Sequence, residues 1–183
     1  MSRALAIALA ASGCAACGAA PPPATPVEPT RPPITRPLDV TPFLAIDRIC
    51  SIVPEAVVRE LPFDAEGRPS ASVPENPACW WSAGPSLHVK VYSTRDVLAE
   101  AYARPTSVPE DGPSAPVFAG AATVLGQPAA FLLDSRDKDR HGCRIVVGLT
   151  ETSGVDIDGG QTLDCDELRP VAEGIVATLA GQA

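Results

Sequence analysis

CRIVVGL at residues 143–149 and CDELRPVAEGIVATL at residues 165–179 are the two segments that decide the fold class of this chain. In the first, every second residue from Cys143 is apolar, so these residues fall on one face of a strand. Its buried positions are Cys143, Ile145, Val147 and Leu149. The second segment repeats apolar residues at helical spacing and predicts an amphipathic helix. Its apolar stripe is Leu168, Val171, Ala172, Ile175, Val176 and Leu179.

The start of this last helix carries negative charge. Asp164, Asp166 and Glu167 stand where a helix N-terminus favours carboxylates. Pro170 cannot donate a backbone hydrogen bond inside a helix, so we expect either a kink or a start later than Cys165.

The rest of the chain predicts helices and strands in alternating groups. Residues 43–61 indicate a helix in two pieces, 62–78 a loop, and 94–105 a helix capped by Thr94. The strands are expected at 79–82, 87–92, 117–124, 129–133 and 143–149, with a short edge strand at 155–157. The hairpin-length links between strands predict an α+β fold, with an antiparallel sheet packed against helices.

The N-terminus has the pattern of a bacterial secretion signal. Arg3 precedes an apolar run from Ala4 to Ala11, which is too short to span a bilayer, and Ser12-Gly13 lead into Cys14. We therefore expect a signal peptide at 1–13, lipidation of Cys14, and a protein held outside the cytoplasm on the cell membrane by its lipid. Lipidation of Cys17, or an ordinary signal peptide without lipid, is the alternative.

Proline dominates the segment after the signal. Residues 18–42 hold nine of the chain's 21 prolines and no aromatic residue, so we expect a disordered, lipid-anchored linker over 14–42. All eight aromatic residues lie between Phe43 and Phe131, which predicts a single α+β domain over 43–183. The acidic net charge of −8, without a basic patch, argues against nucleic-acid binding.

Four cysteines lie in the predicted domain: Cys50, Cys79, Cys143 and Cys165. An even number in an exported chain indicates two disulfides, for which three connectivities exist. We expect the pairs closest in sequence, Cys50–Cys79 and Cys143–Cys165. A four-thiolate metal site is disfavoured because the domain lacks paired CxxC spacing.

These cysteines and their neighbours resemble a known family. The shared features are Cys50 before Pro54-Glu55-Ala56-Val57, Cys79-Trp80-Trp81, the turn from Leu125 to Ala130, and Cys143 and Cys165 opening a strand and a helix. In this order and spacing, residues 43–180 resemble the actinobacterial lipoprotein family catalogued as domain of unknown function 3558. The resemblance implies the location and the fold, and it implies no reaction or catalytic residue.

Trp80 and Trp81 are the candidate binding residues. Neighbouring strand residues face opposite sides of a sheet, so one tryptophan is expected in the core. The other can serve as an exposed aromatic anchor for a ligand or partner. Alternation alone does not say which is which.

Motifs for catalysis or metal binding are weak. Gly84-Pro85-Ser86-Leu87-His88 lacks the last glycine of a nucleophile elbow, and His141 belongs to a charged hairpin tip. Residues 156–167 match a calcium loop only in part, because Gln161 stands where that loop needs glycine. We therefore expect no metal and no cofactor.

The sequence favours a non-enzymatic cell-envelope lipoprotein domain of unknown activity. We expect it to bind an envelope protein or a small apolar ligand, in addition to its membrane anchor. An envelope hydrolase or wall-modifying enzyme is one alternative. A structural accessory of an envelope complex is the other.

Overall fold

A single antiparallel sheet with the strand order β1-β2-β3-β7-β6-β5-β4 forms the centre of the computed structural model. The structure describes residues 29–62, 66–71, 76–82, 86–107, 115–137 and 140–181. The strands are β1 (Arg68–Ala71), β2 (Pro77–Ser82), β3 (Ser86–Tyr92), β4 (Val117–Val124), β5 (Gln127–Asp137), β6 (Arg140–Thr150) and β7 (Ser153–Asp158). With the helices on the two sides of the sheet, this confirms the predicted α+β class.

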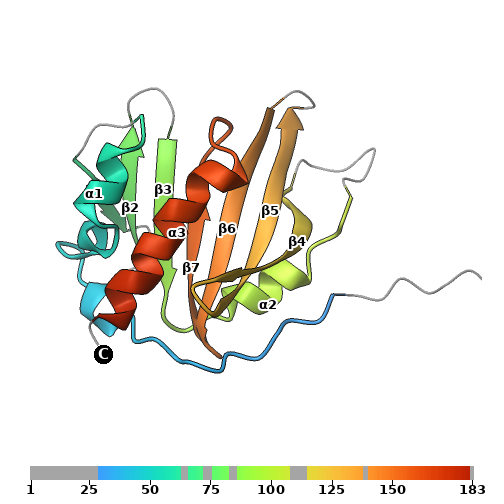
Figure 1. Cartoon of the computed structure of the whole chain (residues 1–183), viewed down its shortest axis with the longest axis horizontal. Helices are drawn as coiled ribbons and strands as arrows, with labels where there is room; N and C mark the ends of the chain where they lie inside the picture. The colour runs from blue at the N-terminus through green and yellow to red at the C-terminus, as the bar shows by residue number, and fades with distance from the viewer. Residues whose placement is uncertain are drawn as a thin grey trace, which may run out of the picture.

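One side of the sheet carries the larger hydrophobic core. Here α3 (Cys165–Ala180) crosses the strands (Figure 1), joined by α1 (Glu55–Arg59) and the 3-10 turns η1 (Thr41–Phe43) and η2 (Ile49–Ile52). The apolar stripe predicted for α3 is buried in full, and so is the alternating face of β6. The hydrophobic effect of this burial is the main term that holds the sheet and α3 together.

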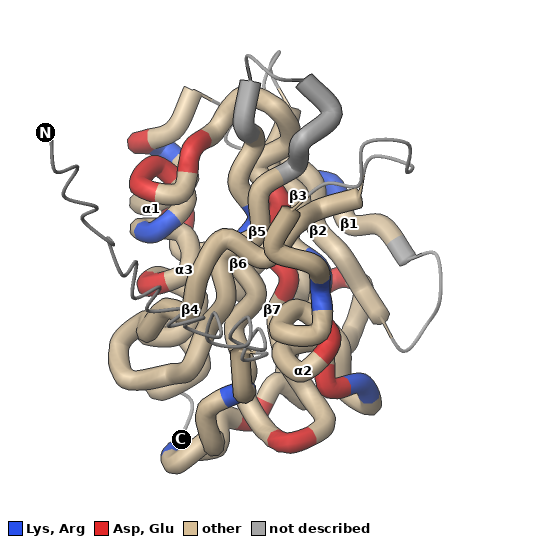
Figure 2. The backbone as a smooth tube through the Cα atoms, turned by 90° about the vertical axis from the view of Figure 1, so that its right-hand side faces the viewer, with Lys and Arg blue, Asp and Glu red and all other residues tan. Residues whose placement is uncertain are grey.

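The other side of the sheet is covered only in part. Figure 2 shows α2 (Val97–Tyr102) on the side opposite α1 and α3. This helix contacts β5, β6 and β7 and forms a second, smaller cluster with Phe118, Leu132 and Val146. Over β1, β2 and β3 the described residues place no helix, and Trp80 is 49% exposed there. This uncovered part of the sheet is the open face.

Several local predictions are wrong. Residues 155–157 were expected at an edge, but β7 pairs with both β3 and β6 in the middle of the sheet. The predicted loop at 62–78 contains the edge strand β1, which pairs with β2. Asp96, not Thr94, caps α2 by accepting a hydrogen bond from the Ala99 amide.

Residues 29–42, which we call the docked segment, are packed against the sheet instead of forming linker. In Figure 1 this segment (blue) runs along one end of the strands. The Leu38 amide donates to the Leu149 carbonyl at 3.0 Å, and Leu38 and Val40 are buried. The Gln127 side chain donates to the Arg36 carbonyl, and Arg31 forms ion pairs with Asp96 and Glu151. The packed unit therefore begins before residue 43, where the sequence placed the boundary.

Both predicted disulfides are confirmed. Cys50 in η2 bonds to Cys79 in β2, and Cys143 in β6 bonds to Cys165, the first residue of α3. Each bond ties a helical segment to a strand. Because each bond lowers the entropy of the unfolded chain, it raises the free energy of unfolding by about 3 kcal/mol for loops of this length in the chain-entropy model.

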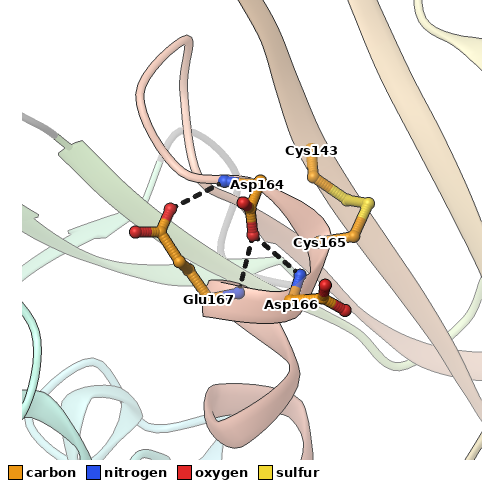
Figure 3. The surroundings of a disulfide bond; sticks show 5 residues. All are labelled: Cys143, Asp164, Cys165, Asp166 and Glu167. Carbon is orange, nitrogen blue, oxygen red and sulfur yellow. Dashed lines mark hydrogen bonds between the residues drawn. A yellow bond between two sulfur atoms is a disulfide. The ribbon is translucent and has the colours of Figure 1, made fainter.

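The start of α3 is fixed by a capping box (Figure 3). Asp164 accepts hydrogen bonds from the amides of Asp166 and Glu167, and the Glu167 side chain accepts from the Asp164 amide. These bonds satisfy amides that have no partner within the helix. The helix thus begins at Cys165 with Pro170 inside it, and the expectation of a later start is wrong.

None of the helices that the structure describes combines the length and apolarity required to cross a membrane.

Candidate functional site

A polar row crosses the open face from strand to strand. The register pairs Arg68 with Trp80, Trp80 with His88, His88 with Asp158, and Asp158 with Arg144. Directly opposed residues in an antiparallel pair have Cβ atoms about 5 Å apart, so these side chains are neighbours. Five strands thus bring an aromatic ring, an imidazole and an ion pair into one line.

A pocket of about 390 Å³ lies along this row. The described residues that line it are Ser70, Trp80, Ser86, His88, Asp158 and Gly160. We call it the Trp80 pocket. Its volume falls within the range of small-molecule sites, about 300–1,000 Å³. The lining combines one large apolar surface with several polar groups, and such a mixture orients a ligand.

Gly160 and Gly142 allow the loop after β7 to form one wall of this pocket. Gly160 has a φ of +60°, a conformation that favours glycine. A Cβ atom at Gly142 would lie 1.7 Å from the Gly160 carbonyl oxygen, so only glycine lets the loop pass this close to β6. The loop is further held because the Gly160 amide donates to Asp158 at 2.9 Å.

The two tryptophans face opposite sides of the sheet, as the strand alternation predicted. Trp81 is 2% exposed and belongs to the core on the α3 side, whereas Trp80 is 49% exposed on the open face. Trp81 also lines a hollow of about 250 Å³ beside Pro54 and Val58. Since Gly67 lies directly against its ring, little of the Trp81 surface is available to a ligand. The Trp80 pocket is therefore the stronger candidate site.

Arg144 lies between two carboxylates beside the pocket. Its Nη2 atom is 2.5 Å from Asp158 Oδ2, and its Nε atom is 3.4 Å from Asp156 Oδ1. Burial alone would lower the pKa of Arg144, but the two carboxylates outweigh burial and hold its pKa above the ordinary value. Burial raises the pKa of Asp156, against the opposing effect of Arg144. Burial also lowers the pKa of His88, although Asp158 opposes this.

A second hollow lies between α2 and the sheet. It measures about 140 Å³ and is bordered by Arg95, Glu100, Arg104, Arg144 and Asp156. Arg95 pairs with Glu100, and Arg144 pairs with Asp156, so most of its charge is matched within the protein. It is smaller and more charged than the Trp80 pocket, and we do not assign it a ligand.

The carboxylates of the calcium-loop comparison do not converge. Asp156 and Asp158 pair with Arg144, whereas Asp164 and Glu167 close the capping box. Within the described residues, no three His, Cys, Asp or Glu side chains form a cluster that could hold a metal ion.

Other predicted residues lie outside the described part of the chain. Cys14, Cys17, Gly84 and Pro85 are not among the described residues, and the His141 side chain is not described either. Ser86 and His88, which belong to the incomplete nucleophile-elbow motif of the sequence, both line the Trp80 pocket.

Sequence reasoning missed Ser70, Gly160 and the pairing of Asp158 with His88. Ser70 was assigned to a loop, and Asp158 was considered only in the calcium-loop comparison. The alternation of β3 does indicate that His88 points away from the core. Which carboxylate lies opposite His88 depends on the register of β3 and β7, which the sequence does not specify.

Comparison with known proteins assigns this chain to a family but matches it to no individual protein. The family described as "Protein of unknown function (DUF3558)" matches residues 9–178. No curated protein and no solved structure matches the chain.

Replacing Arg144 tests the charge balance beside the pocket. In Arg144→Met, Asp156 and Asp158 lose their shared cation, so we expect a loss of about 2 kcal/mol or more in the free energy of unfolding at pH 7. Because its pKa is already raised in the folded state, Asp156 protonates more readily in the folded protein than in the unfolded chain. The deficit should therefore shrink as the pH falls from 7 towards 4.

Denaturant unfolding at several pH values measures this effect. Arg59→Met is the control, because Arg59 forms an exposed pair with Glu55 and its loss should change little at any pH. A deficit of Arg144→Met that stays constant with pH would show that lost packing, not the carboxylates, causes it.

Proposed function

We propose a ligand-binding function for this chain, which belongs to the DUF3558 family of proteins of unknown function. The observation that carries the proposal is the position of Trp80. Its indole is half exposed at a pocket of about 390 Å³, on the part of the sheet that the described helices leave uncovered. A large aromatic side chain beside convergent polar groups is typical of a binding anchor.

Packing in the hydrophobic core does not account for a tryptophan at position 80. Trp81, its neighbour, already fills the position on the α3 side of β2, and the core there is closed over it. Trp80 therefore leaves apolar surface in water that a ligand could cover, at roughly 25 cal/mol for each Å² buried.

We further propose that the protein is a lipoprotein anchored outside the cytoplasm through Cys14. The signal pattern before Cys14 supports this proposal, and so do the two disulfides, since such bonds persist in oxidising compartments. Two acyl chains give stable anchoring where one gives only marginal binding.

Fractionation of cells tests the anchor. Cys14→Ala should move the protein from the membrane fraction to the soluble fraction, because the acyl chains are lost. Cys17→Ala is the matched control and should stay with the membrane. The reverse result would show that Cys17, and not Cys14, carries the lipid.

An enzymatic function is the second candidate, because Ser86, His88 and Asp158 line one pocket. A catalytic relay needs hydrogen bonds from serine to histidine and from histidine to the carboxylate. In the part of the chain that the structure describes, the Asp158 oxygens are bonded to Arg144 and the Gly160 amide instead, and no Ser86–His88 bond is present. This arrangement favours binding over hydrolysis.

An activity-based probe separates these two functions. A fluorophosphonate should leave Ser86 unlabelled, since no base activates its hydroxyl in this geometry. Ser70→Ala and Ser86→Ala serve as matched variants. Labelling that Ser86→Ala removes and Ser70→Ala does not would establish an activated serine and overturn the non-enzymatic proposal.

Replacing each tryptophan tests the binding function. We expect native mass spectrometry of protein purified from its own source to show a bound molecule. Trp80→Ala should lose that molecule with nearly unchanged thermal stability, the behaviour of an exposed anchor. Trp81→Ala should lower the free energy of unfolding by about 3–5 kcal/mol, because it empties a core position.

Ile46→Ala is the control, since Ile46 is a similarly exposed apolar side chain outside the pocket lining. It should keep both the bound molecule and the stability. If wild-type protein carries no bound molecule and also binds no added ligand in a Trp80-dependent way, the structural-accessory alternative replaces the binding function.

A further inference from the structure

We propose that the Trp80 pocket binds one ring of a neutral saccharide. This inference rests on the proposed binding function of the same pocket and names the chemical class of its ligand. Three properties of the pocket carry it: a flat aromatic wall, polar groups around that wall, and the absence of an unpaired charge among its described lining residues.

Trp80 supplies the aromatic wall. The face of an indole carries partial negative charge, and the C–H groups on one face of a sugar ring carry partial positive charge. Trp80 is 49% exposed, so its ring offers room for such a stack. His88 lies directly opposite in the register of β2 and β3 and extends the wall with a second ring.

The hydroxyls of Ser70 and Ser86 line the same pocket. Each can donate one hydrogen bond and accept others. Among the described residues, neither hydroxyl has a hydrogen-bond partner. A Cβ atom at position 160 would lie 2.9 Å from Ser86 Oγ, so the glycine keeps this hydroxyl accessible from the loop side. Sugar hydroxyls, which both donate and accept, match these groups.

The charges of the pocket are balanced within the protein. The Asp158 carboxylate is 2.5 Å from Arg144 Nη2 and also accepts from the Gly160 amide. Burial lowers the pKa of His88 and so favours its neutral form, although Asp158 opposes this effect. Among the described residues that line the pocket, no unpaired charge is therefore left to attract an ammonium or a phosphate group, and Arg68, opposite Trp80 in the register, is not one of these lining residues. The net charge of −8 further disfavours anionic ligands.

The polar lining also disfavours an acyl chain. A site for a hydrocarbon chain needs a continuous apolar wall, whereas Trp80 is the one large apolar side chain among the described residues that line this pocket. The small apolar ligand that the sequence suggested fits this lining less well than an amphipathic ring does.

Nuclear magnetic resonance of the ¹⁵N-labelled full chain tests the inference. The chain has two tryptophans and so two indole N–H signals, which Trp80→Phe assigns. Trisaccharides of glucose, mannose, arabinose and N-acetylglucosamine are added singly at about 10 mM, a concentration that detects millimolar affinity. At least one should shift the Trp80 signal saturably, and the signal of buried Trp81 should move less.

Variants and other ligand classes complete the experiment. Trp80→Ala should weaken saccharide binding about tenfold or more, whereas Trp80→Phe and the distant Ile46→Ala should retain it. The comparison probes are choline, inorganic phosphate, adenosine and hexanol.

The saccharide inference is overturned if no sugar shifts the Trp80 signal, or if Trp80→Ala leaves sugar binding unchanged. If a comparison probe then binds in a Trp80-dependent way, the binding function stands with a different ligand class. If none of the probes binds and the purified protein carries no bound molecule, both proposals fail.

Discussion

Cys143 anchors the connection between β7 and α3 to the sheet. Its amide donates to the Leu163 carbonyl at 2.9 Å, and its carbonyl accepts from the Gly159 amide at 3.0 Å. Its side chain bonds to Cys165. One residue of β6 therefore holds the whole connection from β7 to α3. The same connection places α3 over the core and Gly160 at the Trp80 pocket, so the core and the candidate site depend on a common support.

Strand alternation separates the structural residues from the candidate binding residues. In β6, Cys143 faces α3 and Arg144 faces the open side, where it pairs with Asp158. In β2, Trp81 faces the core and Trp80 faces the pocket. At these four positions, the odd-numbered residues belong to the core and the even-numbered residues lie at or beside the candidate site. A shift of one residue in register would turn the core side chains to the open face and the site side chains into the core, so that both the core and the site would be lost.

Local patterns in the sequence were enough to predict the fold class, both disulfides and the last helix. These features depend on spacing within one segment or between cysteines close in sequence. The position of β7 in the middle of the sheet was not predicted, because strand order depends on contacts between distant segments. β1 was missed for a different reason. Its sequence, RPSA, has no apolar alternation, and as an edge strand it pairs on one side alone.

The candidate site was predicted in part. Alternation required one tryptophan to leave the core, and the structure identifies it as Trp80. The pairing of His88 with Asp158 follows from register, which composition does not specify. The docked segment was misassigned because its prolines indicate an extended chain, and an extended chain can still pack. Leu38 and Val40 are two residues apart, so an extended backbone directs both to the same side and into the core.

The docked segment also decides how the domain responds to mechanical force. A pull from the N-terminal side reaches Arg31 and its ion pairs first. The hydrogen bond from Gln127 to the Arg36 carbonyl comes next, and then Leu38 and Val40 must leave the core. We expect these contacts to break in this order, from the N-terminal end inward, before the force acts on the strands. We therefore expect the segment to detach first under load, while the strands and the open face keep their shape.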